Sequence, residues 1–416
     1  MAIPPSTKLL GIFAINVMKI MMIGYYLIPE YVEAIKKSVF IISESLSYKH
    51  EIIFITPGAK DKIINYNGIK IYTIGVPGFG FYNFLKSIPH FIKKSREIIK
   101  NERPDIIHDH FGLYGSSMIT NRIVRDSHIP LIKTVYTHPV KVRDIRLFFQ
   151  NPGINKTVQE YIPNFLLNNK TLFSKVTKNF NSLIYQTNTL RYELKSNPDV
   201  RSCYIPNGID YKEFSTAKKV YKEEIKEFIQ YNQIEESTKN IFYLGHFSAQ
   251  KGIDYIIKAM PTVIKEIKNV KFIFAWSGKG EFDYYYEKIK KKNLDKYTIF
   301  LGKVDPKIAF APMDLFILPL VCPWGTISSP STILESMASG TSVISTRVGS
   351  IPEILKGRGF LIPPLDSRKL SESIIYALTN EKETKKLRIK AKYFASNFGW
   401  KKITKELEKV YIKNEK

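Results

Sequence analysis

One acidic residue, Glu335, stands in an otherwise small and apolar segment, STILESMASG at 331–340. Ser329 suits the N-cap of a helix over this segment, and Pro330 suits its first position. The backbone N–H groups that follow lack partners within the helix, and together with the helix dipole they attract an anion. The segment therefore predicts an anion-binding helix start. Its expected donors are the amides of Ser331 and Thr332 and the hydroxyls of Ser328 and Ser329.

Glu335 itself has two interpretations. Thr332 and Glu335 match the S/T-x-x-E capping box, in which the acid is a structural residue that completes the start of the helix. Alternatively, the carboxylate accepts hydrogen bonds from hydroxyl groups of a ligand bound at the same helix start. The pattern alone leaves both interpretations open.

A second loop carries a cation in an unusual place. The segment YLGHFSAQKGIDYIIKAM at 243–260 reads as a strand, a glycine turn and a helix. Lys251 lies at the start of this helix, where a cation is unfavourable unless an anion is bound. We therefore expect Lys251 to bind a diphosphate, with Gly245 in the turn and His246 as a second donor. A solvated surface lysine is the alternative. The loop WSGKGE at 276–281 has glycines that admit a ligand, but this pattern is weak.

The elements that must position these loops alternate between buried strands and amphipathic helices. We expect strands at 19–27, 51–57, 105–111, 130–138 and 182–188, and again at 241–247, 270–276, 297–302, 315–319 and 341–346. This alternation is typical of parallel sheets with right-handed crossovers. It predicts an α/β protein with two doubly wound, Rossmann-like domains that face a cleft. Ligands of such sheets bind at the carboxyl ends of the strands.

The chain divides into four predicted parts, because 416 residues exceed what one core usually holds. The polar, charge-dense stretch of about 25 residues that ends at Asn240 is interpreted as a linker region. The parts are an extension at 1–17, an acceptor domain at 18–209, a donor domain at 210–395, and a C-terminal helix at 396–416 that packs back towards the first domain.

The composition is that of a globular chain, with 44% hydrophobic and 24% charged residues, which excludes wholesale disorder. Cys203 and Cys322 provide neither a disulfide framework nor a metal-ligand cluster, and this fits a reducing compartment. An apolar stretch at 9–29 is about as long as a membrane span. Asn16 and Lys19 interrupt it, and no signal-peptide pattern accompanies it. We therefore expect no transmembrane helix.

The net charge is +25, from 63 Lys and Arg against 38 Asp and Glu. Such a field favours polyanions, which include phosphates, anionic lipid headgroups and nucleic acid. Solvated, lysine-rich helix faces are the alternative explanation. No recognition helix or RNA-binding aromatic motif accompanies the charge, so no nucleic-acid partner is expected.

The motifs, taken in order, resemble family 4 glycosyltransferases, which are retaining enzymes of the GT-B fold. The resemblance runs from about Met18 to Tyr411. It comprises DIIHDHFGLYG, YIPNGIDYKEF, YLGHFSAQKG, FAWSGKGE, FLGKV, LESMASGTSVISTRVGSIPEIL and GFLIPPLDSRKLSESI. Each motif alone is weak, whereas their order and spacing together are specific.

The resemblance implies roles for individual residues. Glu335 corresponds to the family glutamate that binds the ribose hydroxyls of a nucleotide-sugar donor, and Lys251 to the lysine that binds its diphosphate. His110 corresponds to the N-domain histidine near the transferred sugar and the acceptor. The backbone of Lys303 and Val304 lies where the family binds the nucleobase. His110 and Lys251 are the expected catalytic residues.

Three departures from the family pattern affect the expected site. Ile327 occupies the place of the first family glutamate, which normally contacts the transferred sugar. His246 replaces the usual arginine, so part of the charge on the diphosphate must be met elsewhere. The residues at 31–34 replace the usual Gly-Gly, which reduces access to the donor from the N-domain backbone. The alternative function is therefore a non-catalytic nucleotide- or glycan-binding relative with a degenerate donor site.

The expected mechanism needs neither a metal nor a cofactor. Lys251, His246 and the helix-start amides stabilise the charge that develops on the leaving nucleoside diphosphate. The sequence contains no DxD-like acidic pair in a loop that would hold a metal. The resemblance implies retention of configuration, with attack from the face that the leaving group occupies. His108 is interpreted as structural.

The acceptor is indicated only by basic and aromatic segments at 79–100 and 140–180. Such surfaces suit peripheral attachment to anionic membranes. We therefore expect a polyprenyl-linked glycan or another membrane glycoconjugate as acceptor. The expected location is the cytoplasm, on the cytoplasmic face of the membrane. An ordinary core with a solvated face is the alternative.

Overall fold

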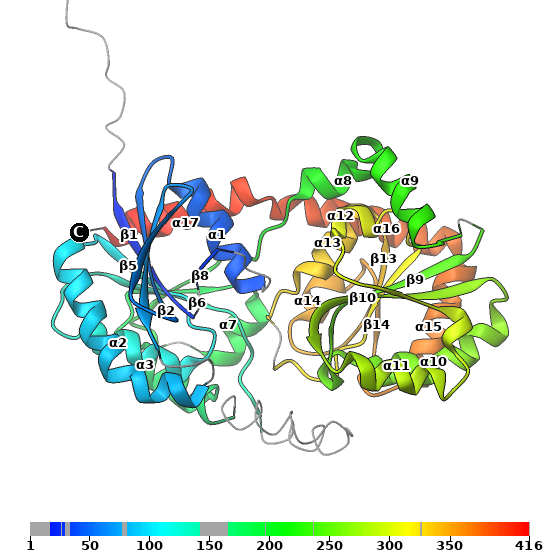
Figure 1. The fold of residues 1–416 in the computed structure, drawn as a ribbon, viewed down its shortest axis with the longest axis horizontal. Helices are drawn as coiled ribbons and strands as arrows, with labels where there is room; N and C mark the ends of the chain where they lie inside the picture. Colours follow the sequence, from blue (N-terminus) through cyan, green and yellow to red (C-terminus); the bar gives the residue numbers. More distant parts are fainter. Residues whose placement is uncertain are drawn as a thin grey trace, which may run out of the picture.

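A computed structural model of the chain describes residues 17–25, 27–29, 34–76, 81–141, 165–195, 197–235, 237–324 and 327–415. Two α/β domains lie side by side (Figure 1), each built on one sheet with helices on both faces. The predicted pair of doubly wound domains is therefore confirmed. The extension at 1–17 falls almost wholly outside the described residues.

The N-terminal sheet has the strand order β3-β4-β2-β1-β5-β6-β7-β8. All its pairs are parallel except β3 with β4. Its central strands are continuous apolar runs because helices cover both faces of the sheet. The strands are β1 (Lys19–Ile23), β2 (Glu51–Gly58), β3 (Lys62–Tyr66), β4 (Ile69–Gly75), β5 (Ile106–Asp109), β6 (Leu131–Val135), β7 (Ser182–Tyr185) and β8 (Arg201–Tyr204).

Two layers of helices cover this sheet. The outer layer contains α2 (Phe81–Glu102), α3 (Ser117–Ile123) and α6 (Lys170–Thr177), and α7 (Asn188–Leu194) follows β7. The opposite layer pairs α1 (Ala34–Leu46) with the C-terminal helix α17 (Trp400–Asn414). Ile403, Leu407 and Tyr411 of α17 are buried in the same apolar cluster as Met18 and Ile20. The end of the chain thus completes the core of its first domain (Figure 1).

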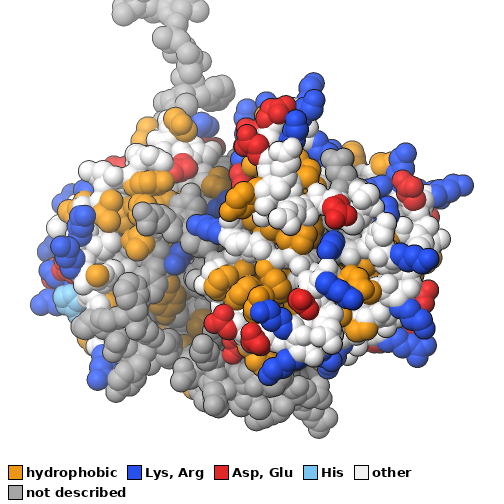
Figure 2. Space-filling view, turned by 45° about the vertical axis from the view of Figure 1, so that its right-hand side comes forward, with side chains coloured by type: hydrophobic (Ala, Val, Ile, Leu, Met, Phe, Trp, Pro, Cys, Tyr) orange, Lys and Arg blue, Asp and Glu red, His pale blue; other side chains and the backbone are white. Residues whose placement is uncertain are grey.

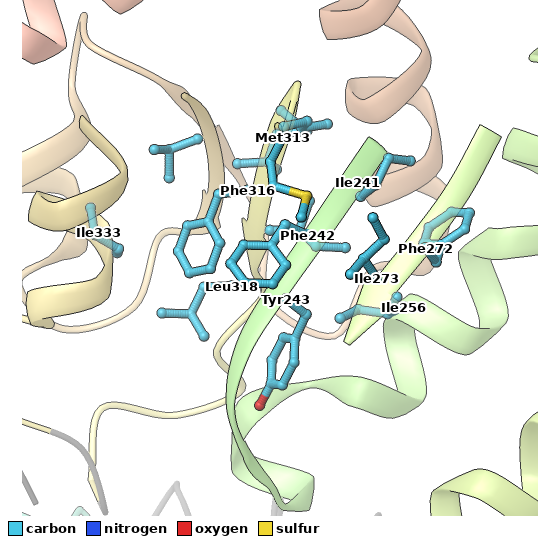
Figure 3. Packing of buried hydrophobic residues seen from close by; sticks show 14 of the residues in the cluster. Ile241, Phe242, Tyr243, Ile256, Phe272, Ile273, Met313, Phe316, Leu318 and Ile333 are labelled. Atoms are coloured by element: carbon cyan, nitrogen blue, oxygen red, sulfur yellow. The ribbon is translucent and has the colours of Figure 1, made fainter. Parts of the chain in front are cut away.

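The C-terminal sheet is wholly parallel, in the order β11-β10-β9-β12-β13-β14. Figure 3 shows its core, where Phe242 and Phe316 lie between β9 and the helix that carries Ile333. The strands are β9 (Lys239–Phe247), β10 (Val270–Gly280), β11 (Thr298–Leu301), β12 (Leu315–Leu318), β13 (Ser342–Thr346) and β14 (Phe360–Ile362). One face carries α10 (Ile253–Glu266), α11 (Phe282–Lys290) and α15 (Ser367–Thr379); the other carries α12 (Pro306–Ala309), α13 (Ser331–Ser339) and α16 (Glu381–Ala395).

The predicted linker before Asn240 is wrong. Two helices occupy it, α8 (Tyr211–Val220) and α9 (Lys222–Tyr231). Ile225, Phe228 and Ile229 repeat at helical spacing within the charged stretch, and Phe228 and Ile229 pack against the C-terminal core. The charge density that suggested a linker belongs to the solvated side of these helices.

Hydrogen bonds join the two domains beside the ends of their sheets. Glu353 of α14 (Ile351–Leu355) accepts bonds from the backbone N–H groups of Asn188 and Thr189, at 2.9 and 2.7 Å. The His138 Nε2 atom lies 2.7 Å from the Ser350 hydroxyl oxygen. Glu353 therefore caps the start of α7 from the other domain and holds the carboxyl ends of the two sheets together.

No helix among the described residues is long and apolar enough to cross a membrane. Within the apolar stretch at 9–29, the segment Lys19–Ile23 is the buried strand β1.

Candidate functional site

A cleft of about 350 Å³ opens at the carboxyl ends of the C-terminal strands, opposite the start of α1. It is lined by Ala34, Lys37, Leu244, Gly245, His246, Lys251, Trp276, Lys303, Val304, Pro306, Leu318, Ile327, Pro330, Ser331, Thr332 and Glu335. A larger hollow of about 710 Å³ lies beside α9 at the amino ends of β9 and β12, where Asn240 and Asp314 contribute to it. The cleft, and not this hollow, contains the predicted chemistry.

The helix that carries Glu335 begins one residue later than predicted. Pro330 is the N-cap of α13, with an extended backbone at φ −61° and ψ 117°, and no side chain caps the helix. Thr332 therefore lies inside the first turn, where it cannot act as the N-cap of a capping box. The predicted N-cap Ser329 and the capping-box interpretation of Glu335 are both wrong.

The Glu335 carboxylate faces the cleft with little access to solvent, since the residue is 6% exposed. No hydrogen bond from any described residue reaches the carboxylate oxygens. Burial raises its pKa to about 7, Asp210 and Asp305 contribute in the same direction, and Lys37 opposes them. An acid held in this way is poised to accept hydrogen bonds from a ligand.

Lys251 reaches the cleft from the turn between β9 and α10. The next residue, Gly252, has φ +77°, and a Cβ atom there would lie 1.9 Å from the carbonyl oxygen of Pro319. Only glycine fits this position, so the turn has a fixed shape. Burial lowers the pKa of the half-buried Lys251 to about 8. A cation is thus placed beside the start of α10 at a cost that a bound anion would offset.

The other predicted C-terminal residues fall on the same wall. Gly245 and His246 end β9, where the Tyr243 hydroxyl donates a hydrogen bond of 2.5 Å to the His246 carbonyl oxygen. A Cβ atom at position 245 would lie 3.1 Å from the Tyr243 hydroxyl oxygen, so a residue larger than glycine would crowd this side chain. Lys303 and Val304 follow β11 and line the far end of the cleft.

Three predicted residues do not line this cleft. Ser328 and Ser329 are buried, and the Ser328 N–H donates a 2.6 Å bond to the Tyr136 carbonyl oxygen across the domain boundary. His110 lies at the carboxyl end of β5, where its Nδ1 atom is 2.6 Å from the Tyr136 hydroxyl oxygen. Its Nε2 atom is buried and has no hydrogen-bond partner in the described part of the chain. Tyr136 thus lies between His110 and the loop that precedes α13.

Sequence reasoning missed two lining residues that matter for binding. Lys37 projects from the first turn of α1, the same unfavourable position for a cation that singled out Lys251. Trp276 stacks on Phe282, with ring centroids 4.8 Å apart, and presents an aromatic surface beside Lys303. The motif WSGKGE contains this tryptophan, but only its glycines were interpreted as features that admit a ligand.

The arrangement suits a ligand that carries both an anion and hydroxyl groups. Three lysines, His246, the start of α13, one carboxylate and an aromatic ring line the same cleft; the lysines are Lys37, Lys251 and Lys303. In the described ranges, no three His, Cys, Asp or Glu residues lie together as ligands of a metal would. That the reaction needs no metal stays a prediction.

Comparisons with known proteins agree with this geometry. Residues 37–213 match a family model described as "Glycosyltransferase Family 4", and residues 238–380 match one described as "Glycosyl transferases group 1". The chain is 23% identical over 368 residues to N-acetyl-alpha-D-glucosaminyl L-malate synthase of Bacillus anthracis, covering 87% of this chain and 89% of that protein.

Two further likenesses are to another curated relative and to a solved structure. Identity to alpha-monoglucosyldiacylglycerol synthase of Streptococcus pneumoniae is 23% over 384 residues, which covers 88% of this chain and 81% of that one. The fold matches the crystal structure of Anabaena Alr3699/HepE in complex with UDP-glucose, with a TM-score of 0.70 and 16% identity. That match covers 95% of this chain and all of the other, and it identifies the fold as GT-B.

Replacing Glu335 by glutamine should stabilise the ligand-free protein at alkaline pH. The pKa of Glu335 is raised on folding, so its contribution to stability is present below about pH 4.5 and is lost as the pH rises through about 7. Glu335→Gln, which never ionises, should exceed the wild type at pH 8 by about 2–3 kcal/mol in unfolding free energy. The two proteins should be equally stable near pH 4.5.

Urea unfolding at both pH values measures this difference. Glu227→Gln, at an exposed position of α9, is the matched control and should change stability at neither pH. A Glu335→Gln variant that is less stable than the wild type at pH 8 would contradict this account and indicate that Glu335 has a structural role.

Proposed function

Because the chain belongs to glycosyltransferase family 4, we propose that it transfers a sugar from a nucleoside-diphosphate donor bound in this cleft, with retention of configuration. One observation carries the proposal. The buried Glu335 carboxylate, which no described residue bonds, shares a cleft with Lys251 and the start of α13. A ribose needs a hydroxyl acceptor and a diphosphate needs cations and amides, and the cleft offers both.

The donor is proposed to lie along the wall from Lys303 to Lys251. The backbone of Lys303 and Val304 contacts the base, with Trp276 beside it. Glu335 accepts hydrogen bonds from the ribose hydroxyls. The structure of Anabaena HepE with UDP-glucose, which shares the fold, supports a nucleotide sugar as ligand.

The diphosphate is proposed to lie between Lys251 and the amides of Ser331 and Thr332. Lys37 reaches this region from the N-terminal domain and supplies charge that the missing family arginine would have given. A bound diphosphate would restore the pKa of Lys251 towards its ordinary value, because it offsets the cost of burying the ammonium group. His246 adds a hydrogen-bond donor at the end of β9.

The proposed reaction follows from these charges. The bond between the anomeric carbon and the β-phosphate oxygen breaks, and the electron pair stays on that oxygen. Lys251 and the helix-start amides are in place before this charge develops, so no reorganisation is needed when the bond breaks. The acceptor hydroxyl then bonds to the anomeric carbon from the same face, and its proton passes to the leaving phosphate.

The acceptor is proposed to be a lipid-linked glycan or another membrane glycoconjugate, reached from the membrane surface. The likeness to a synthase whose name includes a glucosyldiacylglycerol supports a lipid acceptor. On α2, Lys93, Arg96 and Lys100 are exposed, opposite the buried Phe91 and Ile99. In Figure 2, by contrast, basic and acidic side chains are mixed over the visible face of the C-terminal domain. The residues at 142–164 of the second basic segment lie outside the described residues.

Variants of the two charged residues test the donor site. Lys251→Ala should lower kcat/KM for the donor about ten- to a hundredfold, since a charge-assisted contact contributes roughly 1.5–3 kcal/mol. Glu335→Gln should lower it by a similar factor, because an amide accepts hydroxyl hydrogens less strongly than a carboxylate. Lys258→Ala, on the exposed side of α10, is the control and should match the wild type.

A thermal-shift panel of sugar nucleotides first identifies the donor, because a ligand that binds only the folded state raises the melting temperature. Unchanged donor kinetics in a folded Lys251→Ala or Glu335→Gln variant would contradict the assignment. Binding without hydrolysis or transfer would favour the alternative of a non-catalytic relative, which the loss of the first family glutamate at Ile327 suggests.

Membrane attachment should depend on the basic side of α2. The double variant Lys93→Glu/Lys100→Glu should reduce binding to anionic vesicles at least tenfold, because each basic residue near the surface contributes about 1 kcal/mol. Lys258→Glu/Lys265→Glu makes the same charge change on α10 and should have little effect. Flotation at low and high salt measures this. Equal recovery with neutral and anionic vesicles would contradict attachment through the basic residues of α2.

A further inference from the structure

An interdomain cavity of about 740 Å³ lies at the carboxyl ends of both sheets. In the N-terminal domain its walls come from the segment after β6 and from α7, and in the C-terminal domain from the segments after β12, β13 and β14. No described residue lines both this cavity and the donor cleft. Ligands of open parallel sheets bind at these strand ends, in cavities of roughly this size. The interdomain cavity is therefore a candidate for a second binding site.

The interdomain cavity and the donor cleft flank the same segment of the chain. Leu318, at the end of β12, lines the cleft, and Val321 lines the cavity. Three residues separate the two positions, so their Cα atoms are at most about 11 Å apart. A molecule in the cavity therefore lies next to the wall of the proposed donor site without sharing a lining residue with it.

A glycine turn brings the C-terminal wall of the cavity against the N-terminal wall. Gly349 has φ +52°, and a Cβ atom there would lie 3.0 Å from the His138 ring and 2.9 Å from the Pro323 Cβ atom. Beside this turn, the His138 Nε2 atom lies 2.7 Å from the Ser350 hydroxyl oxygen. The position therefore favours glycine, and the contact between the walls has a fixed shape before any ligand binds.

Glu193 of α7 places an ionised acid on the N-terminal wall. Its Oε2 atom lies 2.5 Å from His138 Nδ1, and its Oε1 atom pairs with the Lys141 ammonium group. Burial raises the pKa of Glu193, but the hydrogen bonds from His138 and Lys141 outweigh burial and lower the pKa to about 2. A carboxylate has about four lone-pair sites, and these contacts use two of them. Glu193 therefore retains acceptor sites for the hydroxyl groups of a ligand.

Two exposed side chains line the cavity from opposite domains. The Arg347 guanidinium follows β13 and has no ion-pair or hydrogen-bond partner among the described residues. Its planar fork matches the oxygens of a carboxylate or a phosphate. Tyr192 of α7 is 75% exposed, so its ring offers an apolar face with a polar hydroxyl at one end. The cavity thus offers a cation, an aromatic face and a carboxylate.

We propose that the interdomain cavity binds the acceptor, and that the acceptor is a sugar that carries an anionic group. This inference rests on the proposed function, to which it adds the place and the charge of the acceptor. Glu193 accepts hydrogen bonds from the acceptor hydroxyls, Tyr192 packs against a sugar ring, and Arg347 binds the anionic group. That group is the carboxylate of an acidic sugar or the phosphate of a lipid linker.

Three probes that share one ring test this charge: glucose, glucuronic acid and glucose 6-phosphate. Saturation-transfer NMR measures their affinity for the wild type and for Lys251→Ala, which shows whether a probe binds in the donor cleft instead. We expect one of the two anionic probes to bind about tenfold more tightly than glucose, and equally to both proteins. The tighter of the two identifies a carboxylate or a phosphate as the group. Equal affinities for all three probes, or no binding of any, would overturn the proposal.

Variants of the cavity test which residues bind the probes. Arg347→Gln should lower the affinity for the anionic probe to that for glucose, because the amide is uncharged. Tyr192→Ala should weaken all three probes about three- to tenfold through the loss of the aromatic face. The matched control is Arg368→Gln, which removes an exposed arginine of α15 that pairs with Glu372, and it should bind the probes like the wild type. A preference for the anionic probe that persists in Arg347→Gln would also overturn the proposal.

Transfer to the bound probe completes the test. With the donor found by thermal shift, mass spectrometry should detect the glycosylated anionic probe. Arg347→Gln should lower kcat/KM for this probe about tenfold while the donor KM stays unchanged. An anionic probe that binds through Arg347 but is neither glycosylated nor slows donor hydrolysis would contradict the acceptor role. A protein that binds the probe through Arg347 but binds no sugar nucleotide would instead count against the proposed function.

Discussion

The carboxyl ends of the two sheets must face each other at a fixed separation, and a carboxylate in the second domain meets this constraint. Glu353 accepts hydrogen bonds from the start of α7, with Thr189 contributing both its N–H and its hydroxyl at 2.7 Å. The Ser350 hydroxyl joins His138 and Thr187 beside it, at 2.7 Å from each. Helix α17 adds a covalent tie, because it leaves the second domain and completes the core of the first. These contacts hold Ala34 and Lys37 of the N-terminal domain opposite the C-terminal wall of the cleft.

Titratable groups with shifted pKa values lie around that cleft and at the facing edge of the N-terminal sheet. An acid, an ammonium group and an imidazole whose pKa values are shifted by burial lie at the facing edges of the sheets; they are Glu335, Lys251 and His110. Titratable groups with such shifts are typical of functional sites. Lys133 and Asp109, which lie close to His110, form a buried ion pair of the N-terminal domain at 3.4 Å.

The sequence predicted the fold well because the strands are nearly continuous apolar runs. Four strands were not predicted, because they are short, exposed on one face or at a sheet edge; they are β3, β4, β8 and β14. The linker prediction failed because three apolar residues in a charged stretch are a weak helical signal, although two of them, Phe228 and Ile229, pack α9 against the C-terminal core. Local patterns describe each element but not the neighbour that it packs against.

Only the C-terminal side of the candidate site was predictable from the sequence. Lys251 was identified because a cation at a helix start is unfavourable unless an anion is bound, and Glu335 because it is the one acid in a small, apolar segment. Lys37 is also a cation at a helix start, in α1. The sequence does not show that it lines this cleft, because only the tertiary structure brings α1 close to the second domain. Ser328 was expected to face a ligand, whereas its N–H is used to join the domains.

Proton exchange on donor binding tests the account most directly. Isothermal titration of the sugar nucleotide in buffers of different ionisation enthalpy counts the protons released or taken up. Ribose hydroxyls favour the ionised form of Glu335, whose pKa is about 7, and a diphosphate favours the charged form of Lys251, whose pKa is about 8. Binding should therefore release protons near pH 6.5 and take them up near pH 8.5, and Glu335→Gln should abolish only the release. Binding with no proton exchange at either pH, or a release that persists in Glu335→Gln, would contradict the placement of the donor.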